Sequence, residues 1–452
     1  MIPYSLCKST SYSRQISILC VLAVFTLLII FPGTSNADLT EMTKLVPGDG
    51  AYNDLFGSSV AISGDCVIVG APNDDEGVLT NSGAAYIFQR SGSTWNQIAK
   101  LIAPDRSHND VFGYSVSISG DYAIVGKPFD DHTGSNYGSA YIFYRNQDGP
   151  NKWGQVAKLV ATTDGGASDG GTNDFFGSSV SISGDYAIVG APNDDDNGSD
   201  SGSAYIYQRF DSTWSQVEKL VAPEGAAGDL FGYSVAINGD EAVVGAPRDD
   251  YDIGADAGFI YFFKRSEDTW STLGPGAGSG AAGDEFGGSV SIDGHFAIAG
   301  SHFYDGGEGL ANSGSARIYE ELNDSGLWYS YISNLLKPSD AAASDEFGFS
   351  VSISGDYAVI GSLKYINGTG TAYVFQKSTD DDDWPQLEKL IASDGSIWGF
   401  GSAVSISGKY AVVGAKWDIN SAGSAYVYNM SSGPSPSPSR AMPWIPLLLL
   451  DE

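Results

Sequence analysis

The sequence is poor in cysteine, histidine and basic residues, and each shortage narrows the classes of protein that it could encode. Only three of its 452 residues are Cys and four are His. The His residues show no HExxH or His-x-His spacing, and no pair of Cys has metal-ligand spacing. Lys and Arg number 23 against 55 Asp and Glu, and the net charge is −32. Because such a surface repels phosphates, we expect no nucleic-acid partner.

Long hydrophobic runs are also scarce. The main one, ISILCVLAVFTLLIIF at residues 16–31, is shorter than the roughly 20 residues of a membrane span. Basic residues precede it, and the small residues Ser35 and Ala37 follow at the positions of a cleavage site. We predict a signal peptide over 1–37, with an uncleaved anchor as the alternative. Cleavage would leave Cys66 as the only Cys, so no intrachain disulfide could form.

What the sequence does contain is a repeat. The dipeptide Phe-Gly is followed each time by a run such as SSVSISGDYAIVGAP, a variable loop, a run such as GSAYIYQR, and in six units a Trp-led run such as WSQVEKLVAPE. These runs predict four short antiparallel strands per unit, with SGD or NGD as a tight turn. Seven such units predict an all-β fold, a seven-bladed β-propeller. The repeated dipeptide begins at Phe56, Phe112, Phe176, Phe231, Phe286, Phe347 and Phe400.

The two ends of the repeat region predict how the ring closes. The seventh unit ends at AYVYNM, residues 425–430, without a Trp-led strand, and LTEMTKLVPGDG at 39–50 resembles that missing strand. We therefore expect an N-terminal strand to complete the last blade, which gives a propeller domain over 38–430. The remaining residues, 431–452, read as a Pro/Ser linker and a short apolar tail.

The seven Phe-Gly pairs, each followed about 14 residues on by Gly-Ala-Pro or a variant of it such as Gly-Lys-Pro, resemble the FG-GAP repeat of integrin α-subunit N-terminal propellers and bacterial secreted proteins. The resemblance implies a propeller used in adhesion or ligand binding, often with calcium. In calcium-binding repeats of that family the first hairpin carries an Asp-rich loop, whereas here it is SGD, NGD, DGH or SGK. One Asp cannot supply the roughly six to eight oxygens that calcium prefers, so those sites are not transferred. Gly-Ala-Pro decays in units five to seven, which we expect to be less regular.

Acidic residues are concentrated in two kinds of segment, the loops after the second strand of each unit and the connections between units. Together these hold more than half of the 55 acids. Antiparallel pairing puts both on one face, which predicts a strongly negative face, with most Arg and Lys on the other. Carboxylates in such loops suit Ca²⁺. The alternative is that the acids keep the protein soluble and form turns. The candidate metal ligands are Asp194, Asp195, Asp196 and Asp200, then Asp74, Asp75 and Glu76.

Two recurrent residues are expected to have structural roles. An Asp lies two places before six of the Phe-Gly pairs, where a carboxylate commonly accepts backbone N–H groups. The Trp that begins each fourth strand is expected to anchor that strand, with sugar stacking as the alternative.

The sequence predicts a binding or adhesion module that is secreted, periplasmic or on the cell surface. We expect a monomeric propeller whose mature chain has no stable membrane span. Its acidic face would contact a protein or glycan ligand. No catalytic residues or organic cofactor are predicted, and we expect no enzyme. A structural surface-layer component and a hydrolase or lyase using the central channel are the alternatives.

Overall fold

The computed structural model describes residues 39–430 except 132–134, 164–168, 251–253, 274–275, 279–280, 308, 323–326, 331–333, 365–369, 381 and 396–397. The chain divides into two units, Met1–Ser35 and Asn36–Glu452. The predicted signal peptide, 1–37, and the tail, 431–452, lie outside the described residues. Within the described part, no helix has the length and apolar character needed to cross a membrane.

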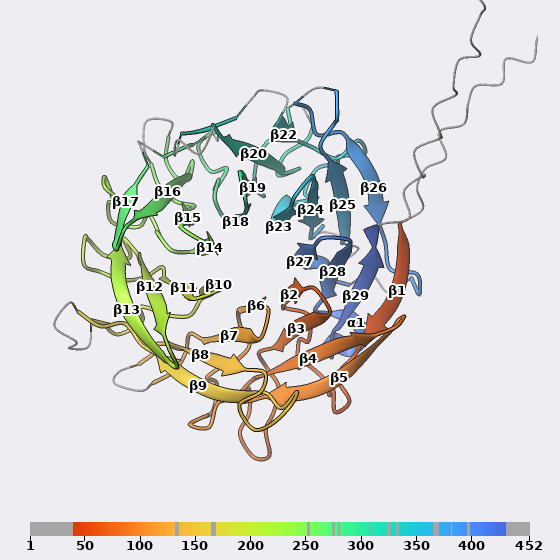
Figure 1. Ribbon diagram of the computed structural model, residues 1–452. Coiled ribbons are helices and arrows are strands. Elements are labelled where there is room, and N and C mark those ends of the chain that lie inside the picture. Colours follow the sequence, from red (N-terminus) through yellow and green to blue (C-terminus); the bar gives the residue numbers. More distant parts are fainter. Residues whose placement is uncertain are drawn as a thin grey trace, which may run out of the picture. The chain divides into compact units, whose positions relative to one another are not determined.

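Seven antiparallel sheets make up the second unit, and each sheet is one blade of the ring in Figure 1. Blade 1 consists of β2 (Ser59–Ser63), β3 (Cys66–Ala71), β4 (Ala84–Ser91) and β5 (Thr94–Leu101). Blade 2 consists of β6 (Val116–Ser119), β7 (Tyr122–Lys127), β8 (Ser139–Tyr144) and β9 (Gly154–Leu159). Blade 3 consists of β10 (Ser179–Ser183), β11 (Tyr186–Ala191), β12 (Ser203–Phe210) and β13 (Thr213–Leu220).

The other four blades follow in the same order. Blade 4 consists of β14 (Ser234–Asn238), β15 (Glu241–Ala246), β16 (Phe259–Ser266) and β17 (Thr269–Thr272). Blade 5 consists of β18 (Ser289–Asp293), β19 (Phe296–Ser301), β20 (Ser315–Glu321), β21 (Trp328–Tyr329) and β22 (Leu335–Leu336). Blade 6 consists of β23 (Phe347–Ser354), β24 (Tyr357–Ser362), β25 (Thr371–Gln376) and β26 (Gln386–Leu390). Blade 7 consists of β27 (Phe400–Ser407), β28 (Tyr410–Ala415), β29 (Ser424–Asn429) and β1 (Thr40–Leu45), and the short α1 (Asp418–Ser421) lies in its second loop.

The ring closes as predicted. The N-terminal strand β1 pairs with β29, so that Lys44 is opposite Tyr426 and Leu45 is opposite Ala425. The first strands of successive blades contact one another, and β2 of blade 1 contacts β27 of blade 7. Figure 1 shows β1 beside β29, with these first strands around the centre. The all-β, seven-bladed propeller is therefore confirmed, together with its closure.

The Phe-Gly pairs form the contacts between blades. Phe112 is fully buried and packs edge-on against Tyr141 of its own blade, with ring centroids 5.6 Å apart, while Ile87 of blade 1 lies in the same cluster. Gly113 has φ of +92°, and a Cβ there would lie 2.2 Å from the carbonyl oxygen of Ala84. Glycine is therefore required at this position both by the backbone conformation and by the close approach of the neighbouring blade.

The expected structural roles of Asp and Trp are also confirmed. Asp229 Oδ2 accepts a hydrogen bond of 2.6 Å from Ala226 N, and the Asp before each of the other five Phe-Gly pairs accepts an equivalent bond. Trp95 is buried and packs edge-on against Tyr410 of the preceding blade, with ring centroids 5.9 Å apart. These Trp residues anchor the outer strands between blades, so sugar stacking is not needed to explain them.

The prediction that blades 5 to 7 are less regular is correct for blade 5 and wrong for blades 6 and 7. Blades 6 and 7 each have four strands, although their Gly-Ala-Pro signature has decayed. The irregular outer strands are in blades 4 and 5, where β17 has only 4 residues and the outer edge of blade 5 is split between β21 and β22. The reason is that the Gly-Ala-Pro triplet lies at the end of the second strand, where other residues are tolerated after the Gly. The outer strand instead needs a run such as WSQVEKL, which blades 4 and 5 both lack.

Candidate functional site

The loop after the second strand of each blade lies against the connection that leads into the next blade. In blade 3, the backbone N–H of Gly228 donates to Ser199 O at 2.9 Å, and that of Leu230 donates to Asp200 O at 3.2 Å. Equivalent bonds join Asn109 to Thr80 and Glu346 to Asn312. The two kinds of acidic segment therefore share one face of the ring, as predicted. We call it the loop face.

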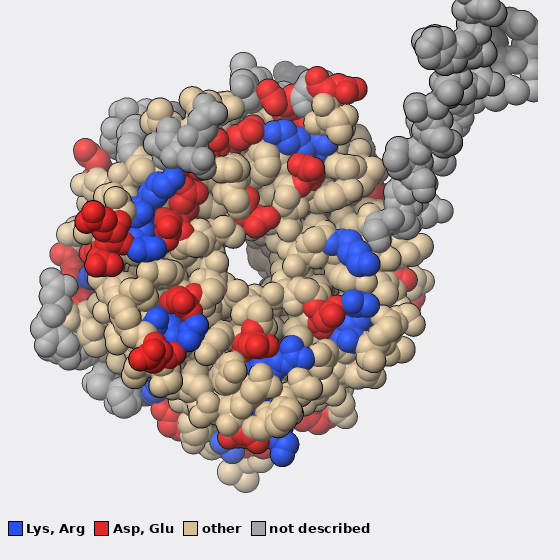
Figure 2. Space-filling model, viewed as in Figure 1, with Lys and Arg blue, Asp and Glu red and all other residues tan. Residues whose placement is uncertain are grey.

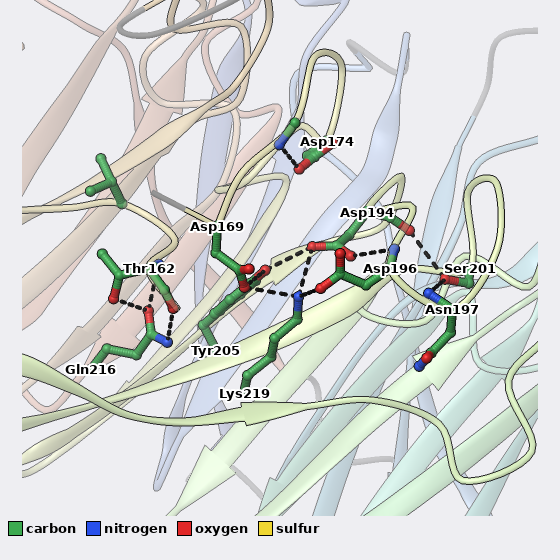
Figure 3. A network of polar contacts seen from close by, with 12 residues as sticks. Thr162, Asp169, Asp174, Asp194, Asp196, Asn197, Ser201, Tyr205, Gln216 and Lys219 are labelled. Carbon is green, nitrogen blue, oxygen red and sulfur yellow. Dashed lines mark hydrogen bonds and ion pairs between the residues drawn. The ribbon is translucent and has the colours of Figure 1, made fainter. Parts of the chain in front are cut away.

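Two of the four first-ranked metal candidates converge, and a lysine lies among them. Oxygens of Asp194, Asp196 and Asp169 lie within 4.8 Å of one another. Lys219 Nζ is 2.9 Å from Asp169 Oδ2 and 3.2 Å from Asp194 Oδ2, and it also contacts Asp196. Tyr205 Oη donates to Asp194 at 2.7 Å. Figure 3 shows the Lys219 side chain rising from its strand to the three carboxylates.

The other two first-ranked candidates form turns instead. Asp195 Oδ1 accepts a hydrogen bond of 2.8 Å from the backbone N–H of Asp200. Asp200 Oδ1 accepts one of 2.7 Å from Asn193 Nδ2. Both side chains therefore hold the loop in its conformation, which is the alternative that the sequence left open for these acids.

Blade 1 repeats the arrangement around Lys100. Its Nζ lies 3.0 Å from Asp74, 3.2 Å from Glu76 and 2.7 Å from Asp49 of the preceding connection. Asp75 stays outside this group and accepts a hydrogen bond of 2.7 Å from the backbone N–H of Asn81. The structure thus brings Asp74 and Glu76 together and separates Asp75 from them.

These lysines belong to a cross-strand pair that sequence reasoning missed. Lys219 on β13 lies opposite Tyr205 on β12, and Lys100 on β5 lies opposite Tyr86 on β4. The same Tyr–Lys pair occurs in blades 2, 6 and 7. The signal was the dipeptide Lys-Leu, which ends the outer strand in five of the blades. In four of these blades a single connection separates this strand from the Tyr-containing third strand.

Lysines also reach the loop face, where the sequence predicted mainly acidic residues. Lysines from five outer strands neutralise part of the acidic loops on the loop face. On the opposite face, Arg90 and Arg209 pair with the turn residues Asp65 and Asp185. Figure 2 shows one face, on which basic and acidic residues lie side by side around a central opening. The two faces differ in charge less than the loop compositions indicated.

The carboxylates around Lys219 are chemically suitable ligands for Ca²⁺, but an ammonium group already lies between them. Burial alone would lower the pKa of Lys219, yet hydrogen bonds to Asp196 and Asp169 outweigh burial and raise that pKa. Lys219 is therefore charged at neutral pH. A calcium ion at this position would have to displace it, and calcium binding stays a prediction.

The loop face contains a pocket of about 480 Å³ that is bordered by residues of blades 1, 2, 6 and 7. We call it the central pocket. It spans the ring, because Phe349 of blade 6 and Tyr114 of blade 2 both border it. A second pocket of about 430 Å³, the side pocket, extends over blades 2 to 4 and is bordered by Phe175, Tyr233 and Arg248. Tyr114 and Phe129 line both pockets, which are therefore adjacent.

Cationic and aromatic side chains meet in the central pocket. Lys416 Nζ lies 4.9 Å from the ring centroid of Trp417 and 5.6 Å from that of Phe349. Burial lowers the pKa of Lys416, and within the described part of the chain no carboxylate lies within ion-pair distance of it. Beside the pocket, burial lowers the pKa of His302 to about 4, so this imidazole is neutral at pH 7.

These pockets could not be predicted from the repeat, because many of their lining residues are the variable ones that flank the repeated motifs. Tyr114 follows a Phe-Gly pair, and Phe129 and Trp417 follow the end of a second strand. Each differs from the residue at the same place in most other units. Only closure of the ring brings them together.

The fold and this face define a seven-bladed propeller that presents loops around a central pocket. A model of the FG-GAP repeat family matches the chain over seven stretches, and the chain belongs to that family. A comparison with curated proteins found no match. Each matched stretch begins at or near an outer strand and ends in the third strand of the following blade, so the family repeat is offset from the blade by one strand. The matches cover residues 39–88, 95–143, 153–207, 214–263, 277–319, 334–375 and 384–428.

Proposed function

We propose that the protein is a secreted or cell-surface binding module, used in adhesion, whose ligand occupies the central and side pockets of the loop face. The observation that carries the proposal is the presence of two adjacent pockets on one face, both lined by exposed aromatic residues. Apolar concave sites with a few polar groups are the usual form of a ligand site. Tyr114 lines both pockets and is 48% exposed although it is a large aromatic residue.

In this proposal the acidic loops have a supporting role. Their carboxylates pair with lysines and backbone N–H groups, which hold the loops around the pockets. The ligand, a protein or a glycan, is then contacted mainly by the aromatic residues. The function proposed is binding without catalysis, which agrees with membership of the FG-GAP repeat family.

An array of glycans and extracellular proteins, probed with the labelled mature chain, tests the proposal. We expect binding to at least one component, and we expect Tyr114→Ala to weaken it at least tenfold because the ring lines both pockets. Tyr52→Ala is the matched control, since Tyr52 is 80% exposed and borders neither pocket. No bound component, or equal binding by Tyr114→Ala and the wild type, would overturn the proposal.

A further inference from the structure

Lys416 differs from the lysines that the outer strands bring to the loop face. The lysines of the outer strands each contact at least one carboxylate, such as Asp340 at 2.5 Å from Lys389. Lys416 instead lies against the rings of Trp417 and Phe349, and the described residues include no carboxylate within ion-pair distance of it. Burying an ammonium without an anion is unfavourable. Among the described residues, the ammonium of Lys416 in the central pocket therefore has no anionic partner.

The rest of the lining is suited to a sugar ring. Flat aromatic side chains, Tyr114, Phe129 and Trp417, offer apolar surfaces on which the C–H face of a sugar can pack. The side-chain amide of Asn73 also borders the pocket and has no hydrogen-bond partner among the described residues. It can bond a sugar hydroxyl, because an amide both donates and accepts. The volume of about 480 Å³ lies within the range of small-ligand pockets.

Charge decides between the possible occupants. A cationic group would be repelled by Lys416, even though aromatic rings alone attract cations. A neutral sugar would leave the ammonium without an anion. A sugar that carries a carboxylate satisfies both the rings and the ammonium, and a charge-assisted hydrogen bond to Lys416 is stronger than a neutral one.

Building on the proposed function, we propose that the central pocket binds a carboxylate-bearing sugar residue, such as a uronic acid. Lys416 pairs with the carboxylate, the aromatic residues pack on the ring, and Asn73 bonds a hydroxyl. In this assignment Lys416 is the residue that selects acidic over neutral sugars, whereas Tyr114 and Phe129 contribute to binding of both.

The test uses the mature chain and the methyl glycosides of glucuronic, galacturonic and mannuronic acid, each beside its neutral parent sugar. Saturation-transfer NMR and calorimetry measure binding. We expect at least one acidic sugar to bind at least tenfold more tightly than its neutral parent, and Lys416→Gln to remove that preference. Lys409→Gln is the matched control, because Lys409 lies at the other end of the same strand, in the turn on the opposite face. Unchanged thermal unfolding of both variants shows that they are folded.

Each contrary result has a distinct meaning. Equal binding of an acid and its parent, or a preference that persists in Lys416→Gln, overturns the role of Lys416 while the pocket remains a binding site. Binding of an acidic peptide such as acetyl-aspartyl amide, with no sugar bound, overturns the sugar assignment. If no sugar binds, the inference fails, yet the proposed function still stands wherever array binding depends on Tyr114.

Discussion

At the scale of single residues, the glycine of a Phe-Gly pair is restricted twice. Gly113 adopts a positive φ, and the carbonyl of Ala84 in the neighbouring blade lies where a Cβ would be. Gly120, in the turn between β6 and β7, also has a positive φ of +57°, but nothing lies within 4 Å of its Cβ position. Substitutions at these two glycines therefore distinguish the free energy lost through the positive φ from the free energy lost through the close contact between blades.

We expect Gly113→Ala to destabilise the protein by about 3 kcal/mol or more, because backbone strain and steric overlap add. Gly120→Ala should cost about 1 kcal/mol, from the positive φ alone. Denaturant unfolding of both variants measures the difference. Equal losses would mean that the blades move apart easily at the Phe-Gly pair, contrary to the packing described here.

The buried Asp before a Phe-Gly pair is predicted to weaken the fold at high pH. Burial, with the nearby charges of Asp249 and Asp250, raises the pKa of Asp229 to about 6, although the hydrogen bond from Ala226 acts in the opposite direction. The unfolded chain has an Asp pKa near 3.8. Between these values the folded chain binds more protons than the unfolded chain, so the contribution of Asp229 to stability falls as pH rises from about 4 to 6.

Asp229→Asn keeps an acceptor for Ala226 N and removes the buried charge. We expect this variant to be about 2 kcal/mol more stable than the wild type at pH 8, and to have lost that advantage at pH 4. Urea unfolding at the two pH values gives the comparison. Asp211→Asn, in an exposed turn, is the control and should change stability little at either pH. A variant that is destabilised at pH 8 would show that the ionised carboxylate is favourable there.

At the scale of strands and loops, the sequence predicted more about backbone than about side chains. Strand positions followed from alternation and from repeated turns, and the Phe-Gly contacts followed from repetition. The ion pairs of the acidic loops could not be predicted in this way, because they depend on strand register. Lys219 reaches Asp194 only because β13 pairs with β12 so that Lys219 is opposite Tyr205. The central pocket was also unpredictable, since Tyr114 and Phe349 are distant in sequence and do not belong to the shared part of the repeat.

The Tyr–Lys pair leads to a prediction about calcium. In the wild type the ammonium of Lys219 already lies between its three carboxylates, so we expect millimolar Ca²⁺ to leave the thermal midpoint unchanged. Lys219→Met leaves buried carboxylates without a cation and should cost about 2 kcal/mol or more. Calcium binds the folded state of this variant and should restore part of that stability.

Thermal unfolding with CaCl₂, and with chelator, measures this effect. Lys152→Met, which removes an exposed lysine, is the control and should respond to neither. A calcium-dependent rise in the wild-type midpoint would instead support the calcium site expected from the sequence, with the ion binding despite Lys219.

At the scale of the whole molecule, the closing strand links the first and last residues of the ring. Strand β1 is the outer strand of blade 7, and Lys44 on it forms ion pairs of 2.6 Å with both Asp394 and Asp418. Leu45 is buried in a cluster shared between blades 7 and 1. Loss of this strand would expose the edge of β29 and open the junction between those blades.

Deleting residues 38–47 should therefore lower the thermal midpoint by roughly 10 °C or more and broaden the transition, because the ring then unfolds from the open junction. Deleting residues 431–452 is the matched control: it removes a longer segment that the sequence assigns to a linker and tail, and it should leave the midpoint unchanged. Calorimetry of both truncated chains beside the mature chain makes the comparison. A single sharp transition at the wild-type temperature after loss of 38–47 would show that closure by β1 contributes nothing, and that the contacts between first strands hold the seven blades together on their own.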